Sequence, residues 1–324
     1  MWHRSVFTRL GSVLLLACLG TGTAAAQSYP VKPVRIIVPF APGGPNDILA
    51  RIVGQKLTEA WGHQMIVENR PGGGTVIGTE IVAKSPPDGY TLLMVSTSHT
   101  TNPTLLPRLP FDTLRDLAPV MLVATSSNVV VSHPSLPAKS VKELIAVARA
   151  RPDNVAYGSG GNGTSTHLAG AMLALLGGVK MIHVPYKGGG PATIALLGGE
   201  ITWMVGTIIP PMPYIKSGRL RALAVTGAQR TPVLPDVPTV AESLPGFEAA
   251  AWFGVATSGG TPKEVISKLN QEIARGLNTG DTRARLAAEA TEIVGGSPEE
   301  FGRFFRAEID KWAKVIRSAG IRLE

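Results

Sequence analysis

The chain has 324 residues, a formal net charge of +8 and a single cysteine. This length exceeds what one hydrophobic core comfortably serves, so two domains are expected. The lysines and arginines are scattered singly instead of gathering in a patch interleaved with aromatic residues, which excludes a typical nucleic-acid-binding protein.

The N-terminus has the pattern of a secretory signal peptide. Arg4 and Arg9 precede a short apolar run, and three alanines end at Ala26. This predicts cleavage after Ala26, so that residues 1–26 are a signal peptide and the mature chain is exported to the periplasm. Removal of Arg4 and Arg9 lowers the net charge from +8 to +6. Cys18 follows Leu-Leu-Ala as in lipoproteins, so a lipid anchor at Cys18 stays an alternative.

The first half of the chain alternates short β-rich runs with helical patterns. Strands are expected at residues 34–38, 65–68 and 90–96, and helices at residues 47–61 and 75–84. This alternation predicts βαβ units around a largely parallel sheet, and hence an α/β fold.

A second series of the same kind begins near residue 129. Its expected strands are residues 129–132, 155–157, 181–184, 201–205 and 220–225, and its expected helices are residues 141–150, 165–176 and 192–197. Two apolar stripes with helical spacing follow, over residues 265–277 and 301–316. They predict two further helices near the C-terminus.

Two strand-like segments separate the series. Residues 117–128 and 247–257 contain no turn residues of their own, so they could be strands that cross between two domains. Such crossings would make the first domain discontinuous, with residues 27–126 and 251–324 in domain 1 and residues 127–250 in domain 2. A hinge is expected at the crossings.

Glycine-rich turns between strands and helices are the most informative motifs. After the strand that ends at Val38, Gly43 and Gly44 let the backbone come close to a bound molecule, and Asn46 or Asp47 can cap the next helix. A helix start offers unpaired N–H groups and partial positive charge, which suffice to hold a carboxylate.

Three similar turns follow, at residues 72–74, 158–163 and 188–190. Ligands of open α/β sheets bind beyond the carboxyl ends of the strands, where such turns gather. We therefore expect a binding role for the turn after residue 38 and for the turn at residues 158–163, with a cleft between the two domains.

Residues 158–163 also fit the G-x-G-x-x-G pattern of dinucleotide-binding proteins. That reading expects an acidic residue about 20 positions further on to hold the ribose. No Asp or Glu occurs between Asn154 and Gly199, so no cofactor is expected. His63, His99, His133 and His183 show no spacing typical of metal ligands, so no metal is expected either.

A hydrolase is the alternative function. Ser165 or Thr166 could serve as nucleophile, with His167 as base. Against this, no G-x-S-x-G motif occurs in the chain, and a hydroxyl close to a histidine in sequence is more typical of a helix cap beside a residue of the helix face.

Seven ordered motifs resemble those of the Bug-type periplasmic receptors of tripartite tricarboxylate transporters. They are Pro33 to Phe40, Pro42-Gly43-Gly44 with Asp47, Val67 to Gly72, Ser85 to Leu93, Gly163 with His167 to Gly170, Val184 to Gly188, and Leu234 to Thr239. The resemblance covers the full length of the chain.

The resemblance implies a two-lobed periplasmic-binding-protein fold, type II-like, with the ligand cleft between the lobes. It implies a monomeric solute receptor rather than an enzyme, which captures a small carboxylate (a mono- or dicarboxylate, an aromatic acid or an amino acid) for membrane transporter subunits. The ligand residues that it implies are Phe40, Ala41, Pro42, Gly43, Gly44, Asp47, Thr97, Gly161, Asn162, Gly163, Thr164, Ser165, Tyr186 and Thr207.

The roles of two of these residues are left open. Asp47 could pair with the ammonium group of an amino acid or could cap its own helix. Thr207 follows Val205-Gly206, where many relatives carry an acidic residue. Its absence would make a purely acidic or aromatic solute more plausible than an amino acid.

Overall fold

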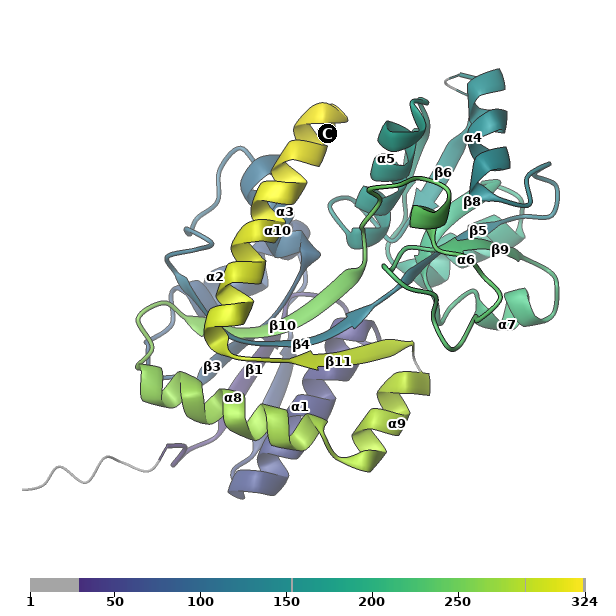
Figure 1. Ribbon diagram of the computed structural model, residues 1–324. Helices are drawn as coiled ribbons and strands as arrows, with labels where there is room; N and C mark the ends of the chain where they lie inside the picture. The colour runs from purple at the N-terminus through teal and green to yellow at the C-terminus, as the bar shows by residue number, and fades with distance from the viewer. Residues whose placement is uncertain (1–28, 153, 289, 323–324) are drawn as a thin grey trace, which may run out of the picture.

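The computed structural model describes residues 29–152, 154–288 and 290–322. The expected signal peptide and Cys18 lie outside this range. Two β-sheets, each flanked by helices, form two lobes that lie side by side (Figure 1). Within the described ranges, no helix has the length and apolar character needed to span a membrane.

The first lobe is built on a six-stranded sheet in the order β11-β4-β10-β3-β1-β2. Its strands are β1 (Val34–Val38), β2 (Met65–Asn69), β3 (Thr91–Ser96), β4 (Leu117–Ser126), β10 (Ala251–Ser258) and β11 (Thr291–Gly295). β1 pairs in parallel with β2 and β3, whereas β10 is antiparallel to both β3 and β4. β1, β2, β3 and β4 therefore all run in one direction.

Helices cover both faces of this sheet. They are α1 (Pro45–Trp61), α2 (Val76–Ala83), α3 (Thr97–Leu105), α8 (Lys263–Leu277), α9 (Gly280–Ala288) and α10 (Pro298–Ser318), with a short 3-10 turn at Gly73–Thr75. α1 and α8 bury apolar residues at helical spacing, such as Val53, Leu57 and Ile273, against one face of the sheet. α10 packs Phe301 and Phe305 against the other face.

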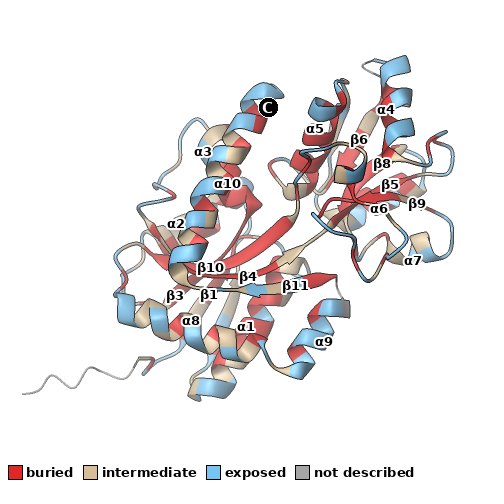
Figure 2. Ribbon diagram, viewed as in Figure 1, coloured by how far each residue is buried: buried red, intermediate tan, exposed pale blue. Residues whose placement is uncertain are grey.

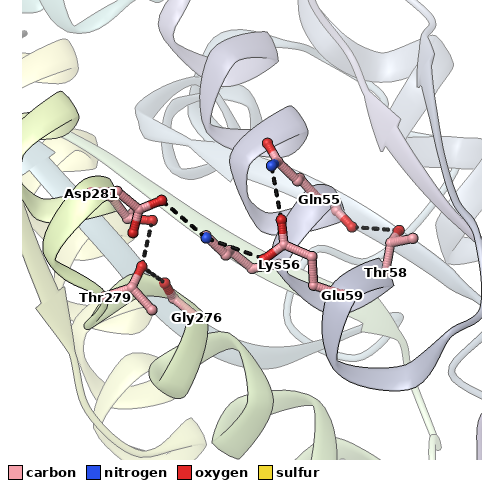
Figure 3. Close-up of polar contacts among 9 residues, drawn as sticks. Gln55, Lys56, Thr58, Glu59, Gly276, Thr279 and Asp281 are labelled. Atoms are coloured by element: carbon pink, nitrogen blue, oxygen red, sulfur yellow. Dashed lines mark hydrogen bonds and ion pairs between the residues drawn. The ribbon is translucent and has the colours of Figure 1, made fainter.

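Polar contacts of Lys56 join α9, near the C-terminus, to α1 within the first lobe (Figure 3). Its ammonium group on α1 lies 3.1 Å from Asp281 of α9 and 3.2 Å from Glu59 of its own helix. The nearby Thr279 hydroxyl donates to the carbonyl of Gly276, 3.0 Å away. Residues that follow the second lobe in sequence thus return to the first.

The second lobe has a five-stranded sheet in the order β7-β6-β8-β5-β9. The strands are β5 (Asn128–Ser132), β6 (Ala156–Ser159), β7 (Ile182–Pro185), β8 (Trp203–Thr207) and β9 (Arg221–Val225), and the helices are α4 (Val141–Ala150), α5 (Ser165–Gly177), α6 (Gly189–Leu197) and α7 (Met212–Lys216), with a 3-10 turn at Val240–Glu242. β6 is parallel to β7 and β8, and β5 is antiparallel to β8 and β9. In the first sheet four strands therefore run one way and β10 and β11 run the other, whereas in the second sheet β5 alone runs against the other four strands.

The two connections between the lobes show toward which lobe the carboxyl ends of the strands point. β4 leads through Ser127 directly into β5, and β10 brings the chain back. Both crossing strands are buried over most of their length (Figure 2). Because β1, β2 and β3 run parallel to β4, their carboxyl ends point toward the second lobe. β6, β7 and β8 run against β5, so their carboxyl ends point back toward the first lobe.

The expected strands and helices of both series are found with ends shifted by up to three residues. One local prediction is wrong: neither Asn46 nor Asp47 caps α1, because the helix already begins at Pro45 with Gly44 as its N-cap. Proline lacks an N–H group and has a helical φ, so it starts a helix without leaving a donor unpaired. The residues of α3, α7, α9 and β11 were not predicted as regular elements.

An ion pair in the first sheet predicts a pH dependence of stability. The Arg35 guanidinium donates to both carboxylate oxygens of Glu68, at 2.6 and 3.1 Å. Hydrogen bonds from Arg35 are the main reason that the pKa of Glu68 falls from 4.5 to about 2. A carboxylate whose pKa is lower in the folded state stabilises the protein above its unfolded-state pKa and loses this contribution as the pH falls toward 2.

We therefore expect Glu68→Gln to lower the free energy of unfolding at neutral pH by about 1 kcal/mol, since the pair is partly exposed. The difference from the parent protein should shrink between pH 4.5 and about 2. Urea unfolding at several pH values measures it. A difference that stays constant down to pH 2 would contradict the assignment.

Candidate functional site

The strand-to-helix turns of the two lobes face each other across the interlobe junction. The turns after β1, β2 and β3 lie at the edge of the first sheet that points to the second lobe, and those after β6, β7 and β8 lie at the opposing edge. The four glycine-rich turns that the sequence singles out all belong to these two sets. This is the place where open α/β sheets bind ligands.

The turn after β1 is exposed and has unpaired backbone donors. Ala41, Pro42 and Gly43 are exposed, and Gly43 has a φ of 85°, a left-handed conformation that favours glycine. Within the described residues, the amides of Ala41 and Gly44 donate no hydrogen bond. Phe40 lies beside this turn, with its ring 6.5 Å from that of His99 on α3. The turn can therefore present N–H groups to an anion.

Asp47 holds this turn in place. The residue is 4% exposed, and its carboxylate accepts hydrogen bonds from the Gly43 amide at 3.0 Å, from Arg51 at 3.0 and 3.1 Å, and from Asn69 at 2.9 Å. Burial raises the pKa of Asp47, but these hydrogen bonds outweigh it, and the pKa lies below its ordinary value. A carboxylate with four donors already in contact orders the turn, whereas pairing with a ligand ammonium group would require it to give some of them up.

The turn after β6 is held by its own side chains. The amides of Gly160, Gly161 and Gly163 donate to Thr166 Oγ1, Ser159 Oγ and His167 Nδ1, at 2.9, 3.0 and 3.1 Å. The Thr164 hydroxyl caps α5. Among the described residues, the amides of Asn162 and Ser165 donate to no partner and remain available at the start of this helix.

The two lobes meet at Gly163. Its carbonyl accepts hydrogen bonds from the hydroxyls of Ser98 and Thr101, at 3.4 and 3.2 Å. Both hydroxyls belong to α3, which follows β3 in the first lobe. Gly163 has a φ of 70°, and a Cβ atom at this position would lie 3.3 Å from Leu105 Cδ1 of the same helix. Only glycine combines this conformation with such a close approach.

Thr97 begins α3 at this junction. It is 2% exposed, and its hydroxyl has no hydrogen-bond partner within the described part of the chain. Ser96 and His99 form a capping box at the same helix start, in which the Ser96 amide donates to His99 Nδ1. Thr97 was among the ligand residues expected from the sequence, whereas Ser98 and Thr101 were not. A run of hydroxyl residues directly after a buried strand is the signal that could have found them.

Tyr186 and Thr207 lie with the second-lobe turns. The Tyr186 amide donates to the carbonyl of Ser159, and the Gly188 amide donates to that of Gly160, both at 3.1 Å. A Cβ atom on Gly189 would lie 3.2 Å from Thr207 Oγ1. The turns after β6 and β7 are thus in direct contact, and the end of β8 adjoins them.

A hollow of about 640 Å³ lies to one side of these turns. It is bounded by α5, by β7 and by the residues that end and follow α10. Of the ligand residues that the sequence predicts, Asn162 alone lines it. The hollow is therefore distinct from the junction of the turns, although it adjoins the turn after β6.

At the residues expected for a hydrolase, no hydroxyl group is hydrogen-bonded to the histidine ring. His167 Nδ1 accepts from the Gly163 amide, and Thr166 Oγ1 accepts from the Gly160 amide. Ser159 does lie 2.6 Å from His183 Nε2, but it is fully buried and beyond the reach of a substrate. These hydrogen bonds shape the turn and give no support to the hydrolase alternative. Across the described residues, no group of three or more His, Cys, Asp or Glu side chains could hold a metal ion.

Comparisons with known proteins agree with this architecture. A family model described as the tripartite tricarboxylate transporter family receptor matches residues 49–321. Protein BugT from Bordetella pertussis is 38% identical over 98% of this chain and 99% of its own. Both matches extend over the two lobes.

Solved structures confirm the two-lobed fold. An R. palustris protein with adipate is 35% identical, covering 91% of this chain and 99% of its own, with a TM-score of 0.83. MatC from Rhodopseudomonas palustris with bound malate is 31% identical, covering 89% of this chain and 100% of its own, with a TM-score of 0.80. The chain therefore belongs to the tripartite tricarboxylate transporter receptor family and is a solute-binding receptor, not an enzyme.

Proposed function

We propose that this receptor captures a small carboxylated solute between its lobes, with the carboxylate held by backbone amides of the turns after β1 and β6. The observation that carries the proposal is that these two turns lie at the facing edges of the two sheets, next to the contact between α3 and Gly163. Each turn has amides without partners among the described residues, at Ala41 and Gly44 on one side and at Asn162 and Ser165 on the other. Such amides bind an oxyanion well in a site shielded from water.

The class of solute is supported by the similar structures, which are described with adipate and with malate. The fourteen residues named in the sequence analysis are our proposed ligand set, and Ser98 and Thr101 support it from α3. The carboxylate of Asp47 is already surrounded by donors of its own lobe, which favours an acid over an amino acid as the solute.

The cellular setting follows from the family and from the N-terminal sequence. Receptors of this family are periplasmic and work with membrane transporter components. We propose that residues 1–26 direct export and are removed, with lipidation at Cys18 as the alternative, and that the mature chain acts as a monomer. We further propose that residues 27–126 with 251–324 move as one lobe and residues 127–250 as the other.

Thermal unfolding of residues 27–324 against a panel of acids tests the proposal. The panel holds mono-, di- and tricarboxylates, aromatic acids and acidic amino acids, each beside its neutral amide. A solute at 100 times its dissociation constant should add about 2.7 kcal/mol to the free energy of unfolding. We expect one class of acid to raise the midpoint and its amides to have no effect. If acids and amides shift the midpoint equally, or neither does, the carboxylate proposal fails.

A further inference from the structure

The hollow beside the turn after β6 has walls from both lobes. α5 and β7 supply one wall, through residues such as Ala171 and Met181, and the chain after α10 supplies the other, through Ile321 and Arg322. In Figure 1 the end of α10 lies across from α5, and the two helices are in contact. Its volume of about 640 Å³ is within the range of small-molecule sites, roughly 300–1,000 Å³.

All charged side chains that line the hollow are basic. Lys180 and Arg322 are exposed at its rim, and no Asp or Glu occurs among its lining residues. Besides these two cations, the lining combines apolar side chains, such as Ala171, Leu175, Val179 and Ile321, with the polar side chains of Asn162, His167, His183 and Ser318. A cavity with a cationic rim and with both apolar and polar groups on its walls is complementary to an organic anion and unfavourable for a cation.

Two histidines supply polar groups inside the hollow. The rings of His167 and His183 stack with centroids 3.7 Å apart and planes 8° apart. Burial lowers the pKa of His167 to about 4 and that of His183 to about 3, so both rings are neutral at neutral pH. His167 is 4% exposed.

Each ring has one nitrogen in use and one without a partner. His167 Nδ1 accepts from the Gly163 amide, so its proton lies on Nε2, and His183 Nε2 is bonded to Ser159. Within the described residues, no hydrogen bond engages the second nitrogen of either ring. The Nε2 atom of His167 is not fully buried, so its N–H group can donate to a molecule in the hollow.

We infer that this hollow is a second binding site, separate from the junction of the turns, for a small organic carboxylate with a compact apolar body. The apolar body lies against Ala171 and Leu175, the carboxylate accepts from His167 Nε2, and Lys180 and Arg322 balance its charge. Because the walls belong to different lobes, an occupant favours the lobe arrangement in which both walls touch it. His167 also holds Gly163, so the occupant contacts a residue that shapes the solute-binding turn.

Benzoate and its neutral analogue benzyl alcohol are suitable probes. With the mature protein labelled at its histidine side chains, we expect millimolar benzoate to shift the NMR signals of His167 and His183 in a saturable way. Benzyl alcohol should leave both unchanged, because it offers no anion. His99 lies beside the turn after β1 and reports separately on the junction.

The double variant Lys180→Ala/Arg322→Ala tests the basic rim. Both side chains are exposed, so folding should not depend on them. We expect benzoate to bind it at least about fivefold more weakly, while the charge-matched control Lys142→Ala/Arg306→Ala binds as the parent does. Shifts confined to His99, shifts that are equal in the two double variants, or an absence of saturation would each overturn the inference. None of these outcomes depends on the identity of the transported solute.

Discussion

Replacing Gly163 with alanine is expected to weaken solute binding by about tenfold or more and to lower stability by roughly 1–2 kcal/mol. The stability loss comes from the φ of 70°, which an L-residue with a Cβ adopts only with strain. The binding loss comes from the new methyl group, which would lie 3.3 Å from Leu105 Cδ1 and 3.5 Å from Thr101 Oγ1. The Leu105 side chain would have to shift by a few tenths of an ångström, which alters the contact between α3 and the turn after β6, where the two lobes meet.

Gly62→Ala is the matched control. Gly62 ends α1 with a φ of 69°, and a Cβ atom there would meet no atom within 4 Å. It should cost about the same stability, since the strain is the same, yet leave solute affinity unchanged. Calorimetric titration and urea unfolding of both variants separate the two effects. Equal affinities for Gly163→Ala and Gly62→Ala would show that the contact between α3 and the turn has no part in binding.

Replacing Glu308 with alanine is expected to lower the free energy of unfolding by about 3 kcal/mol or more. Glu308 is 5% exposed on α10, and one of its oxygens accepts from the indole nitrogens of Trp252 and Trp312, at 3.0 and 2.8 Å. It also forms an ion pair with Lys311. Alanine would leave two buried indole N–H groups without an acceptor and would remove the charge that Lys311 balances.

Glu308→Gln should recover much of this loss, because an amide oxygen can still accept from the indoles. Asp310→Ala, on an exposed position of the same helix, should change stability by less than about 0.5 kcal/mol. Chemical denaturation of the three variants gives the comparison. If Glu308→Ala is no less stable than Asp310→Ala, the buried hydrogen bonds do not contribute as the structure indicates.

The alternating pattern of the sequence was enough to predict the sheet-forming units. Val34–Val38 and Val141–Ala150 were predicted to the residue, because their apolar spacing is regular and their flanking turns are clear. The absence of turn residues at 117–128 and 247–257 predicted a strand in each segment, and the structure has them at Leu117–Ser126 and Ala251–Ser258, the second beginning four residues later than predicted. The wrong capping prediction at Asn46 arose because two suitable capping residues follow Pro45, and proline decided the helix start.

The site was predictable only in part. The glycine-rich turns of the candidate site could be identified, because several glycines between a strand and a helix are typical of a turn that lies close to a bound ligand. α3 was missed because Thr97 to Thr101 and Pro103 favour no helix locally. Its formation depends on the capping box of Ser96 and His99 and on contacts with α10, which come from distant residues. The hollow could not be predicted from the sequence either, because the rings of His167 and His183 come into contact only when β6 pairs with β7.

A crystal structure of the mature protein with the acid that gives the largest thermal shift is the most direct test of carboxylate capture between the lobes. The account predicts carboxylate oxygens at about 2.7–3.2 Å from amides of the turns after β1 and β6, with Gly163 still in contact with α3. An acid bound in the hollow alone, or one whose carboxylate touches neither turn, would contradict it.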